Sequence, residues 1–163
     1  MVIGDTAVGK TCLLLTFTKG RFPSFYIHRV FDNLTTSMVI DQQCTELSLW
    51  DSAGYEDYDR LRPLSYYNTN IFLICFAINN PTSLENVKSK WFPEVSSHSP
   101  DIGIVLVGTK ADLKNRCIDA NQRIITQEEG EKVAMEIGAF AYYETSALEN
   151  TNVKVLFEDT IRF

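Results

Sequence analysis

Apolar runs bounded by turn residues recur along the chain, and segments of helical periodicity separate them. Two of the runs, residues 71–77 and 104–107, are apolar throughout, which is typical of central strands in a parallel sheet covered on both faces. Residues 34–40 and 45–50 instead alternate apolar and polar positions on either side of residues 41–43, which predicts an antiparallel hairpin near one edge. Shorter apolar runs predict two further strands at residues 1–3 and 140–143.

Helix signals lie between the predicted strands. Thr82 and Glu85, after Pro81, form a candidate capping box for a helix that extends through Trp91. A second candidate box is followed by another helical pattern, and the end of the chain has apolar residues at helical spacing. The second box is Thr126 with Glu129, and the terminal positions are Val153, Leu156, Phe157, Thr160 and Ile161. Strands that alternate with helices predict a three-layer α/β sandwich, formed as a single domain over residues 1–163.

The composition is that of a soluble globular domain, with 45% hydrophobic and 22% charged residues among 163. A net charge of -6 without a basic stripe argues against a nucleic-acid partner. No apolar run approaches the roughly 18 residues of a membrane span, and the first residues lack the features of a signal peptide. The cysteines show no C-x-x-C spacing, which favours reduced thiols in a cytoplasmic protein over a zinc site or disulfides. They are Cys12, Cys44, Cys75 and Cys117.

The first candidate site is the pattern G-x-x-x-x-G-K-[ST], which directly follows the first predicted strand and opens a helix. Such a loop wraps a phosphate chain with backbone N–H groups at a helix N-terminus. Lys10 would reach the β and γ phosphates, and Thr11 would hold Mg²⁺. A glycine turn that merely caps a helix is the alternative. The candidate phosphate-binding residues are Gly4, Asp5, Thr6, Ala7, Val8, Gly9, Lys10, Thr11 and Cys12.

Three more loops follow predicted strands. Asp51 could hold Mg²⁺ through water, while the Gly54 N–H could approach a γ-phosphate. Asp112 could accept two hydrogen bonds from guanine, which adenine cannot supply, with the Lys110 stem over the ring. Each loop alone could be an ordinary polar turn. The third loop begins at Thr109, and the fourth, which could offer a backbone N–H to the base oxygen, comprises Ser146, Ala147 and Leu148.

The four loops in this order resemble those of the small GTPases. Local matches narrow the resemblance to the Rac and Rho proteins of the Rho family. They are residues 11–14 (TCLL), 30–33 (VFDN), 56–66 (EDYDRLRPLSY), 90–95 (KWFPEV) and 106–110 (LVGTK). The resemblance implies the P-loop NTPase fold, with a six-stranded, mostly parallel sheet, one antiparallel edge hairpin and about five flanking helices. It also implies GTP or GDP with Mg²⁺, two switch segments that respond to the γ-phosphate, effectors, exchange factors and activating proteins, and signalling to the actin cytoskeleton.

Three positions depart from the family pattern. Thr6 stands where the family usually has a glycine, beside the γ-phosphate. In switch I, near Tyr26, Arg29 aligns with the threonine that ligates Mg²⁺, and arginine has no acceptor for a cation. Tyr55 aligns with the glutamine that orients the attacking water, so the aligned catalytic set is Lys10, Gly54 and Tyr55. We therefore expect slow or absent GTP hydrolysis.

Other features leave the function open. Phe22 resembles the phenylalanine that packs against guanine, although it could be an exposed loop aromatic. Residues 114–125 are shorter than the family's insert helix, the first strand is short, and the chain carries neither a basic tail nor a prenylation motif. The sequence is thus compatible with a GTP-binding switch, with an ordinary cycling GTPase, or with a degenerate interaction module that binds nucleotide poorly.

Overall fold

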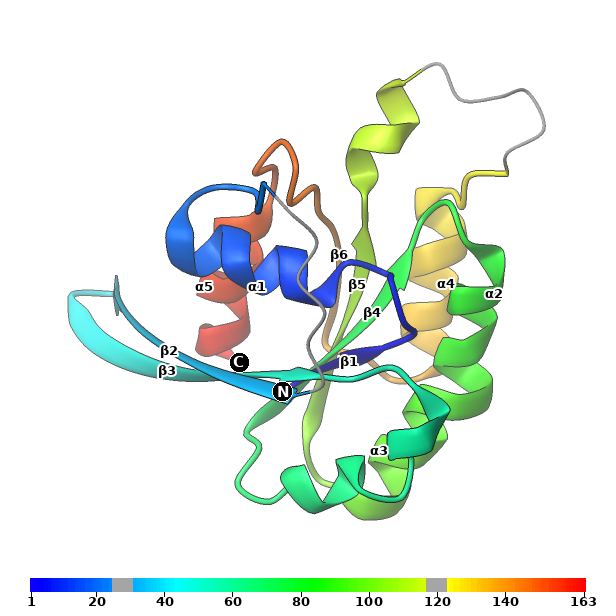
Figure 1. Cartoon of the computed structure of the whole chain (residues 1–163), viewed down its shortest axis with the longest axis horizontal. Coiled ribbons are helices and arrows are strands. Elements are labelled where there is room, and N and C mark those ends of the chain that lie inside the picture. Colours follow the sequence, from blue (N-terminus) through cyan, green and yellow to red (C-terminus); the bar gives the residue numbers. More distant parts are fainter. Residues whose placement is uncertain (25–30, 117–122) are drawn as a thin grey trace.

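The computed structural model describes residues 1–24, 31–116 and 123–163. Its centre is a six-stranded sheet in the order β2-β3-β1-β4-β5-β6 (Figure 1). All neighbouring pairs are parallel except β2 and β3, which are antiparallel. This confirms the predicted mixed sheet. The strands are β1 (Val2–Gly4), β2 (Phe31–Ile40), β3 (Gln43–Ser52), β4 (Ile71–Ala77), β5 (Gly103–Thr109) and β6 (Ala141–Glu144).

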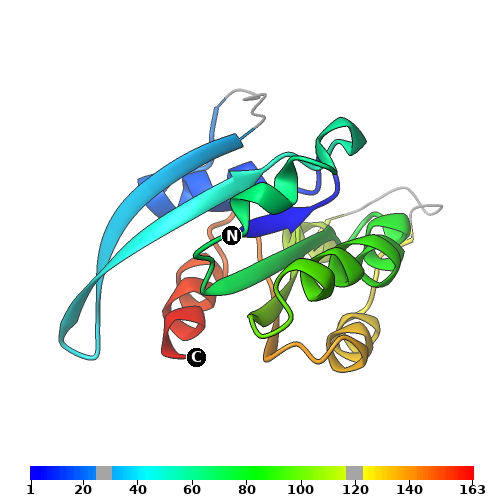
Figure 2. The ribbon, with the colours of Figure 1, turned by 90° about the horizontal axis from the view of Figure 1, so that it is seen from below.

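The hairpin of β2 and β3 is longer than its sequence pattern predicts. Ten residue pairs join the strands, from Phe31 opposite Ser52 to Ile40 opposite Gln43. The turn between them is only Asp41 and Gln42, both at positive φ (49° and 68°), as in the two-residue turns that match the twist of a hairpin. Figure 2 shows the hairpin extending beyond the rest of the sheet.

Helices cover both faces of the sheet. Helices α1 (Lys10–Lys19) and α5 (Val153–Arg162) cover one face, and α4 (Gln127–Glu136) lies on the other. Beside α4, α2 (Pro81–Asn86), a π-helical turn (Val87–Trp91) and α3 (Phe92–His98) form one continuous helix, here called the α2–α3 rod. Within the described residues, four helical units therefore flank the sheet instead of the expected number of about five. Short 3-10 helices lie at Glu56–Tyr58, Arg62–Ser65 and Ala111–Asn115.

Two hydrophobic cores explain the apolar central strands. Along β4, Phe72, Ile74 and Phe76 pack on the side of α4 and the α2–α3 rod. Leu73 and Cys75 alternate with them and pack toward α1 and α5. Successive side chains of a strand point to opposite faces of the sheet. Because helices cover both faces here, the side chains of a central strand are buried on both sides, and the strand is apolar throughout.

The beginnings of two helices test the predicted capping boxes. The box of Thr126 and Glu129 is confirmed, with reciprocal hydrogen bonds of 3.3 and 2.9 Å. The box of Thr82 and Glu85 is wrong. The predicted N-cap is Thr82, whereas the observed N-cap is Asn80, so α2 begins at Pro81, two residues earlier than predicted. The Asn80 side chain accepts a hydrogen bond from the Ser83 N–H at 3.3 Å. Proline suits the first helical position because its missing N–H would be unpaired there anyway.

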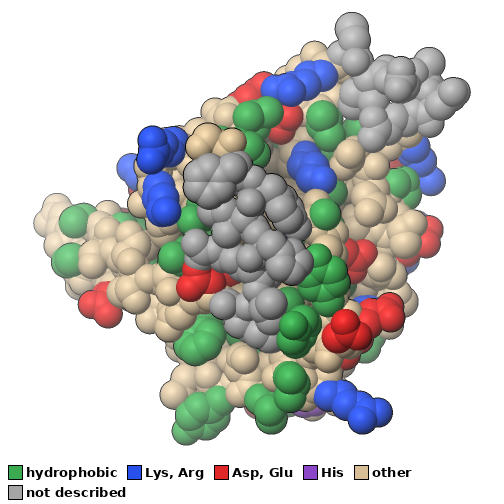
Figure 3. Space-filling view, in the orientation of Figure 1, with side chains coloured by type: hydrophobic (Ala, Val, Ile, Leu, Met, Phe, Trp, Pro, Cys, Tyr) green, Lys and Arg blue, Asp and Glu red, His purple; other side chains and the backbone are tan. Residues whose placement is uncertain are grey.

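The described residues contain no helix long and apolar enough to cross a membrane. The terminal amphipathic helix is confirmed as α5. On the face shown in Figure 3, acidic and basic side chains are interspersed.

Candidate functional site

The phosphate loop joins the end of β1 to the start of α1. It departs from ordinary backbone geometry at Gly4, Ala7 and Gly9, whose φ angles are 140°, 61° and 104°. A Cβ on Gly4 would lie 2.2 Å from the carbonyl oxygen of Cys75 on the neighbouring strand. Glycine is needed there both for its φ and for this close approach. The loop therefore wraps tightly, as the sequence pattern predicts.

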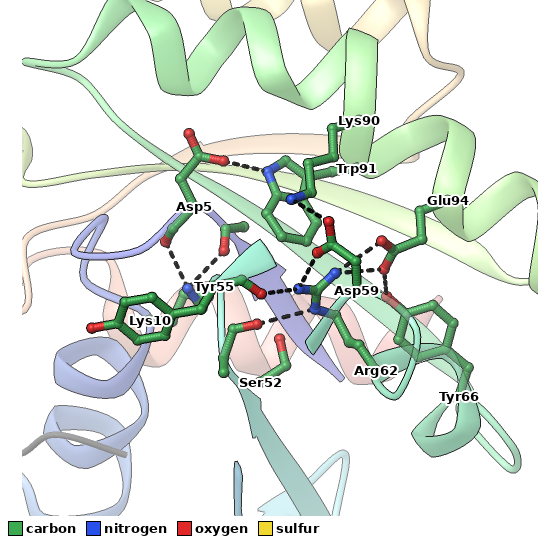
Figure 4. A network of polar contacts seen from close by, with 12 residues as sticks. Asp5, Lys10, Ser52, Tyr55, Asp59, Arg62, Tyr66, Lys90, Trp91 and Glu94 are labelled. Carbon is green, nitrogen blue, oxygen red and sulfur yellow. Dashed lines mark hydrogen bonds and ion pairs between the residues drawn. The ribbon is translucent and has the colours of Figure 1, made fainter. Parts of the chain in front are cut away.

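Lys10 crosses the interior of this loop. Its ammonium donates to the backbone oxygens of Gly4 and Asp5, each at 2.7 Å (Figure 4). Burial lowers the pKa of Lys10 to about 8, although Cys75 and Asp51 act in the opposite direction. Removal from water penalises the charged amine. A phosphate chain placed at the loop would offset that penalty, so the site is chemically suited to an anion.

Thr11 and Asp51 meet where α1 begins and β3 approaches its end. The Thr11 hydroxyl donates to Oδ2 of Asp51, and Asp51 is buried. A hydroxyl and a carboxylate are oxygen ligands of the kind that Mg²⁺ prefers. The described ranges contain no group of three or more His, Cys, Asp or Glu residues that could hold a metal ion. With a nucleotide bound, phosphate oxygens and water could complete the ligands of a Mg²⁺ ion. The two residues fit an ion bound together with a nucleotide.

A cavity of about 260 Å³ lies beside the phosphate loop. It brings together residues of the first, third and fourth predicted loops with Phe22, which is 41% exposed. Its size and mixed lining fit a purine base. The lining residues are Gly9, Cys12, Leu13, Phe22, Thr109, Lys110, Asp112, Leu113, Arg116, Thr145, Ala147 and Leu148.

Asp112 is held at this cavity by its neighbours. One carboxylate oxygen accepts a hydrogen bond from the Ser146 hydroxyl at 2.7 Å, and the other lies 3.6 Å from Nε of Arg116. Lys110 donates to the backbone oxygen of Ala7 at 2.9 Å, which ties the third loop to the phosphate loop. The sequence interpretation missed Arg116, which no motif marks. The only sequence signal for Arg116 is its position about one helical turn after Asp112, a spacing at which opposite charges can pair.

Gly54 lies directly on the phosphate loop. A Cβ on Gly54 would come within 2.5 Å of backbone atoms of Gly4, Asp5 and Thr6. The next residue, Tyr55, is partly buried, and Figure 4 shows its side chain extending away from Arg62. The start of the predicted second switch is thus in contact with the predicted phosphate site. The predicted switch I residues Tyr26 and Arg29 fall outside the described residues.

Comparison with known proteins gives the family. A profile of the Ras family matches residues 1–163. The chain belongs to the Ras family. It is 48% identical over 161 residues to the Ras-like GTP-binding protein RhoL of Drosophila melanogaster, an alignment that spans 99% of this chain and 83% of that protein. The resemblance to small GTP-binding proteins is therefore confirmed, and guanine nucleotide is the ligand class of this Ras-family protein.

The sequence interpretation also missed the role of Arg62. This residue appeared only within a stretch that matches the family, but its side chain is 0% exposed and contacts both the second switch and the α2–α3 rod. Only the run of acidic residues around it hinted at ion pairing.

Proposed function

We propose that this Ras-family protein is a Rho-like signalling switch that binds GTP or GDP with Mg²⁺ and hydrolyses GTP slowly or not at all. The observation that carries the proposal is the contact of Gly54 with the phosphate loop, followed directly by Tyr55. A backbone N–H at Gly54 can sense a γ-phosphate. A phenol cannot hold an attacking water and the transition state as a carboxamide does.

Two further positions support slow hydrolysis. The backbone of Thr6 lies in the part of the phosphate loop that Gly54 approaches, and a threonine side chain at this position would crowd the attacking water and an inserted arginine finger. Arg29 offers no oxygen to Mg²⁺. An arginine finger provides about 10³ to 10⁵-fold acceleration in GTPases that accept one, and this protein would forfeit much of that gain.

Guanine selectivity is assigned to Asp112, with Lys110 over the ring. The carboxylate is already oriented by Ser146, so its position at the cavity does not have to be organised by the ligand. Preorganisation of this kind reduces the entropy lost on binding. GTP and GDP would both be accepted, because the base pocket does not touch the γ-phosphate.

The partners would be effectors that contact the second switch, with exchange factors and activating proteins as regulators. After the Glu56–Tyr58 turn, this segment exposes Leu61, Leu64 and Tyr67, which are 54%, 75% and 85% exposed. Clustered exposed apolar side chains are typical of protein-binding surfaces. Actin-cytoskeletal signalling from the cytoplasm follows from the Rho resemblance.

Single-turnover cleavage of GTP by the purified protein, together with the identity of its copurified nucleotide, tests the proposal. Bound GTP and cleavage far slower than that of a Rho-family protein measured in parallel would support it. Bound GDP with ordinary cleavage would indicate a cycling GTPase. Failure to bind either nucleotide in the presence of Mg²⁺ would indicate an interaction module.

A further inference from the structure

Arg62 is the centre of a buried polar network between the second switch and the α2–α3 rod (Figure 4). Its guanidinium has five N–H groups, and it makes five hydrogen bonds. A buried guanidinium is costly unless its donors are satisfied, so this network defines one position for it. The acceptors are the backbone oxygens of Ala53 (3.0 Å) and Tyr55 (3.1 Å), Oδ1 of Asp59 (2.7 Å), and Oε1 (3.1 Å) and Oε2 (2.9 Å) of Glu94.

The two backbone bonds of Arg62 lie on either side of Gly54. The Ala53 oxygen belongs to the same planar peptide unit as the N–H of Gly54. In a trans peptide the N–H points opposite to the C=O, so an arginine that holds the Ala53 oxygen also sets the direction of the Gly54 N–H. The described chain contains no cis peptide bond. The second bond, to the Tyr55 oxygen, holds the peptide unit between Tyr55 and Glu56.

Trp91 connects this arrangement to the phosphate loop. The Arg62 guanidinium carbon lies 4.7 Å from the centre of the indole ring, within the range of a cation–π contact. The indole Nε1–H donates to Oδ1 of Asp5 at 2.7 Å, and the Asn86 amide donates to Oδ2 at the same distance. One side chain of the rod therefore contacts both the residue that aims Gly54 and the loop that would hold the phosphates.

Glu94 and Lys90 secure the network from the rod. Glu94 also accepts a hydrogen bond from the hydroxyl of Tyr66. Lys90 lies 2.9 Å from a carboxylate oxygen of Asp59. Glu94 binds Arg62 directly and Lys90 binds its partner Asp59, so two charged residues of the rod hold this part of the switch in place.

We infer that Arg62 is a positioning residue for reading the γ-phosphate: it aims the Gly54 N–H, and the contacts of Trp91 with Arg62 and Asp5 keep the phosphate loop in register with that N–H. The inference rests on the proposed function and deepens it. In the proposed function Gly54 contacts the γ-phosphate, which a nucleoside triphosphate has and a diphosphate lacks. Loss of the positioning therefore weakens triphosphate binding selectively, whereas a general loss of structure weakens GTP and GDP alike.

Affinities of Arg62→Lys for a fluorescent GDP and for its non-hydrolysable GTP counterpart, measured with Mg²⁺, test the inference. Lysine keeps a positive charge, but its donors all radiate from one nitrogen and cannot reproduce the planar fork by which three nitrogens of Arg62 reach the two backbone oxygens and Glu94. We expect the ratio of triphosphate to diphosphate affinity to fall at least tenfold from the wild-type ratio, with GDP affinity changed less than threefold. A second variant, Glu94→Gln, keeps the shape of the partner and lowers the ratio in the same direction by a smaller factor.

Lys88→Gln is the matched control, because Lys88 lies on the same rod but pairs with Glu136 on α4. It leaves the ratio unchanged. An unchanged ratio in folded Arg62→Lys, or an equal loss of both affinities, would overturn the inference, and if Arg62→Lys does not fold, Glu94→Gln decides by the same ratio. Wild-type protein that binds neither nucleotide would instead remove the proposed function itself, and the inference with it.

Discussion

The indole N–H of Trp91 donates to the carboxylate of Asp5 across 2.7 Å, joining the α2–α3 rod to the phosphate loop. Trp91 is also fully buried among the apolar residues between the sheet and the rod. The same side chain therefore fills the core and fixes a loop. Trp91 thus links the α2–α3 rod to the backbone of the phosphate loop.

Replacement of Trp91 by phenylalanine separates these two roles. We expect Trp91→Phe to lower the free energy of unfolding by about 2 to 4 kcal/mol, because it leaves a cavity and removes a partner of a partly buried carboxylate. Urea denaturation measures the change. Trp50→Phe is the control, since Trp50 on β3 is 39% exposed, and it should cost less than about 1 kcal/mol. Equal costs for the two variants would contradict the assignment.

Restoration of a glutamine at position 55 addresses hydrolysis. Tyr55→Gln should increase the single-turnover rate of GTP cleavage at least tenfold, because a carboxamide can orient the attacking water. Addition of Thr6→Gly should increase the rate further by removing a side chain from the phosphate loop. Tyr67→Gln, at an 85% exposed position in the same segment, serves as the control. A Tyr55→Gln rate no different from wild type would mean that this position does not limit the reaction.

A methyl group on Gly54 should disrupt the contact between switch and phosphate loop. The added Cβ would lie 2.5 Å from three backbone atoms, so Gly54→Ala has to displace the switch, and triphosphate affinity should fall at least tenfold. Gly20→Ala is the control: its φ of 68° is strained for alanine, but nothing lies within 4 Å of the added methyl. Gly20→Ala should cost about 1 kcal/mol of stability without changing nucleotide affinity. Similar nucleotide affinities in the two variants would refute the steric explanation.

The buried amine of Lys10 predicts a pH dependence of nucleotide affinity. In the free protein burial lowers its pKa to about 8, and a bound phosphate chain would raise that pKa by favouring the charged form. Above pH 8 the free protein has lost a proton that the complex retains, so affinity for GDP should fall with rising pH, by up to about tenfold per unit. Below pH 7 this contribution is constant.

Calorimetric titrations with GDP between about pH 6.5 and 9 measure this dependence and the accompanying proton uptake. Lys10→Arg provides the comparison, since arginine remains protonated throughout the range. If Lys10→Arg still binds GDP, its affinity for GDP should not fall as the pH rises above 8. A wild-type affinity that stays flat across pH 8 would show that Lys10 does not gain charge on binding.

The sheet and much of the candidate site could be predicted from the sequence because their signals are local. The apolar runs of β4 and β5 mark buried strands, and the phosphate loop has fixed glycine positions before Lys10. Asp112 was found for the same reason, as a carboxylate soon after a buried strand.

The Arg62 network could not be predicted, because its partners are separated along the chain. Glu94 lies 32 residues after Arg62, and Trp91 lies 86 residues after Asp5. No periodic pattern reports such pairings. The beginning of α2 was misplaced for a smaller reason: Thr82 and Glu85 matched a capping box, but Asn80 before Pro81 is also a strong cap, and the structure uses it.

The π-helical turn at Val87–Trp91 determines which side chains of the α2–α3 rod face the switch. Each residue of an α-helix advances the direction of its side chain by about 100°. If the same residues were wound as a regular α-helix, Glu94 would be rotated by about that angle relative to α2, away from Arg62. The π-helical turn thus sets the rotation of the rod's second half relative to its first half. The first half packs on the sheet, and the second half directs Glu94 toward the switch.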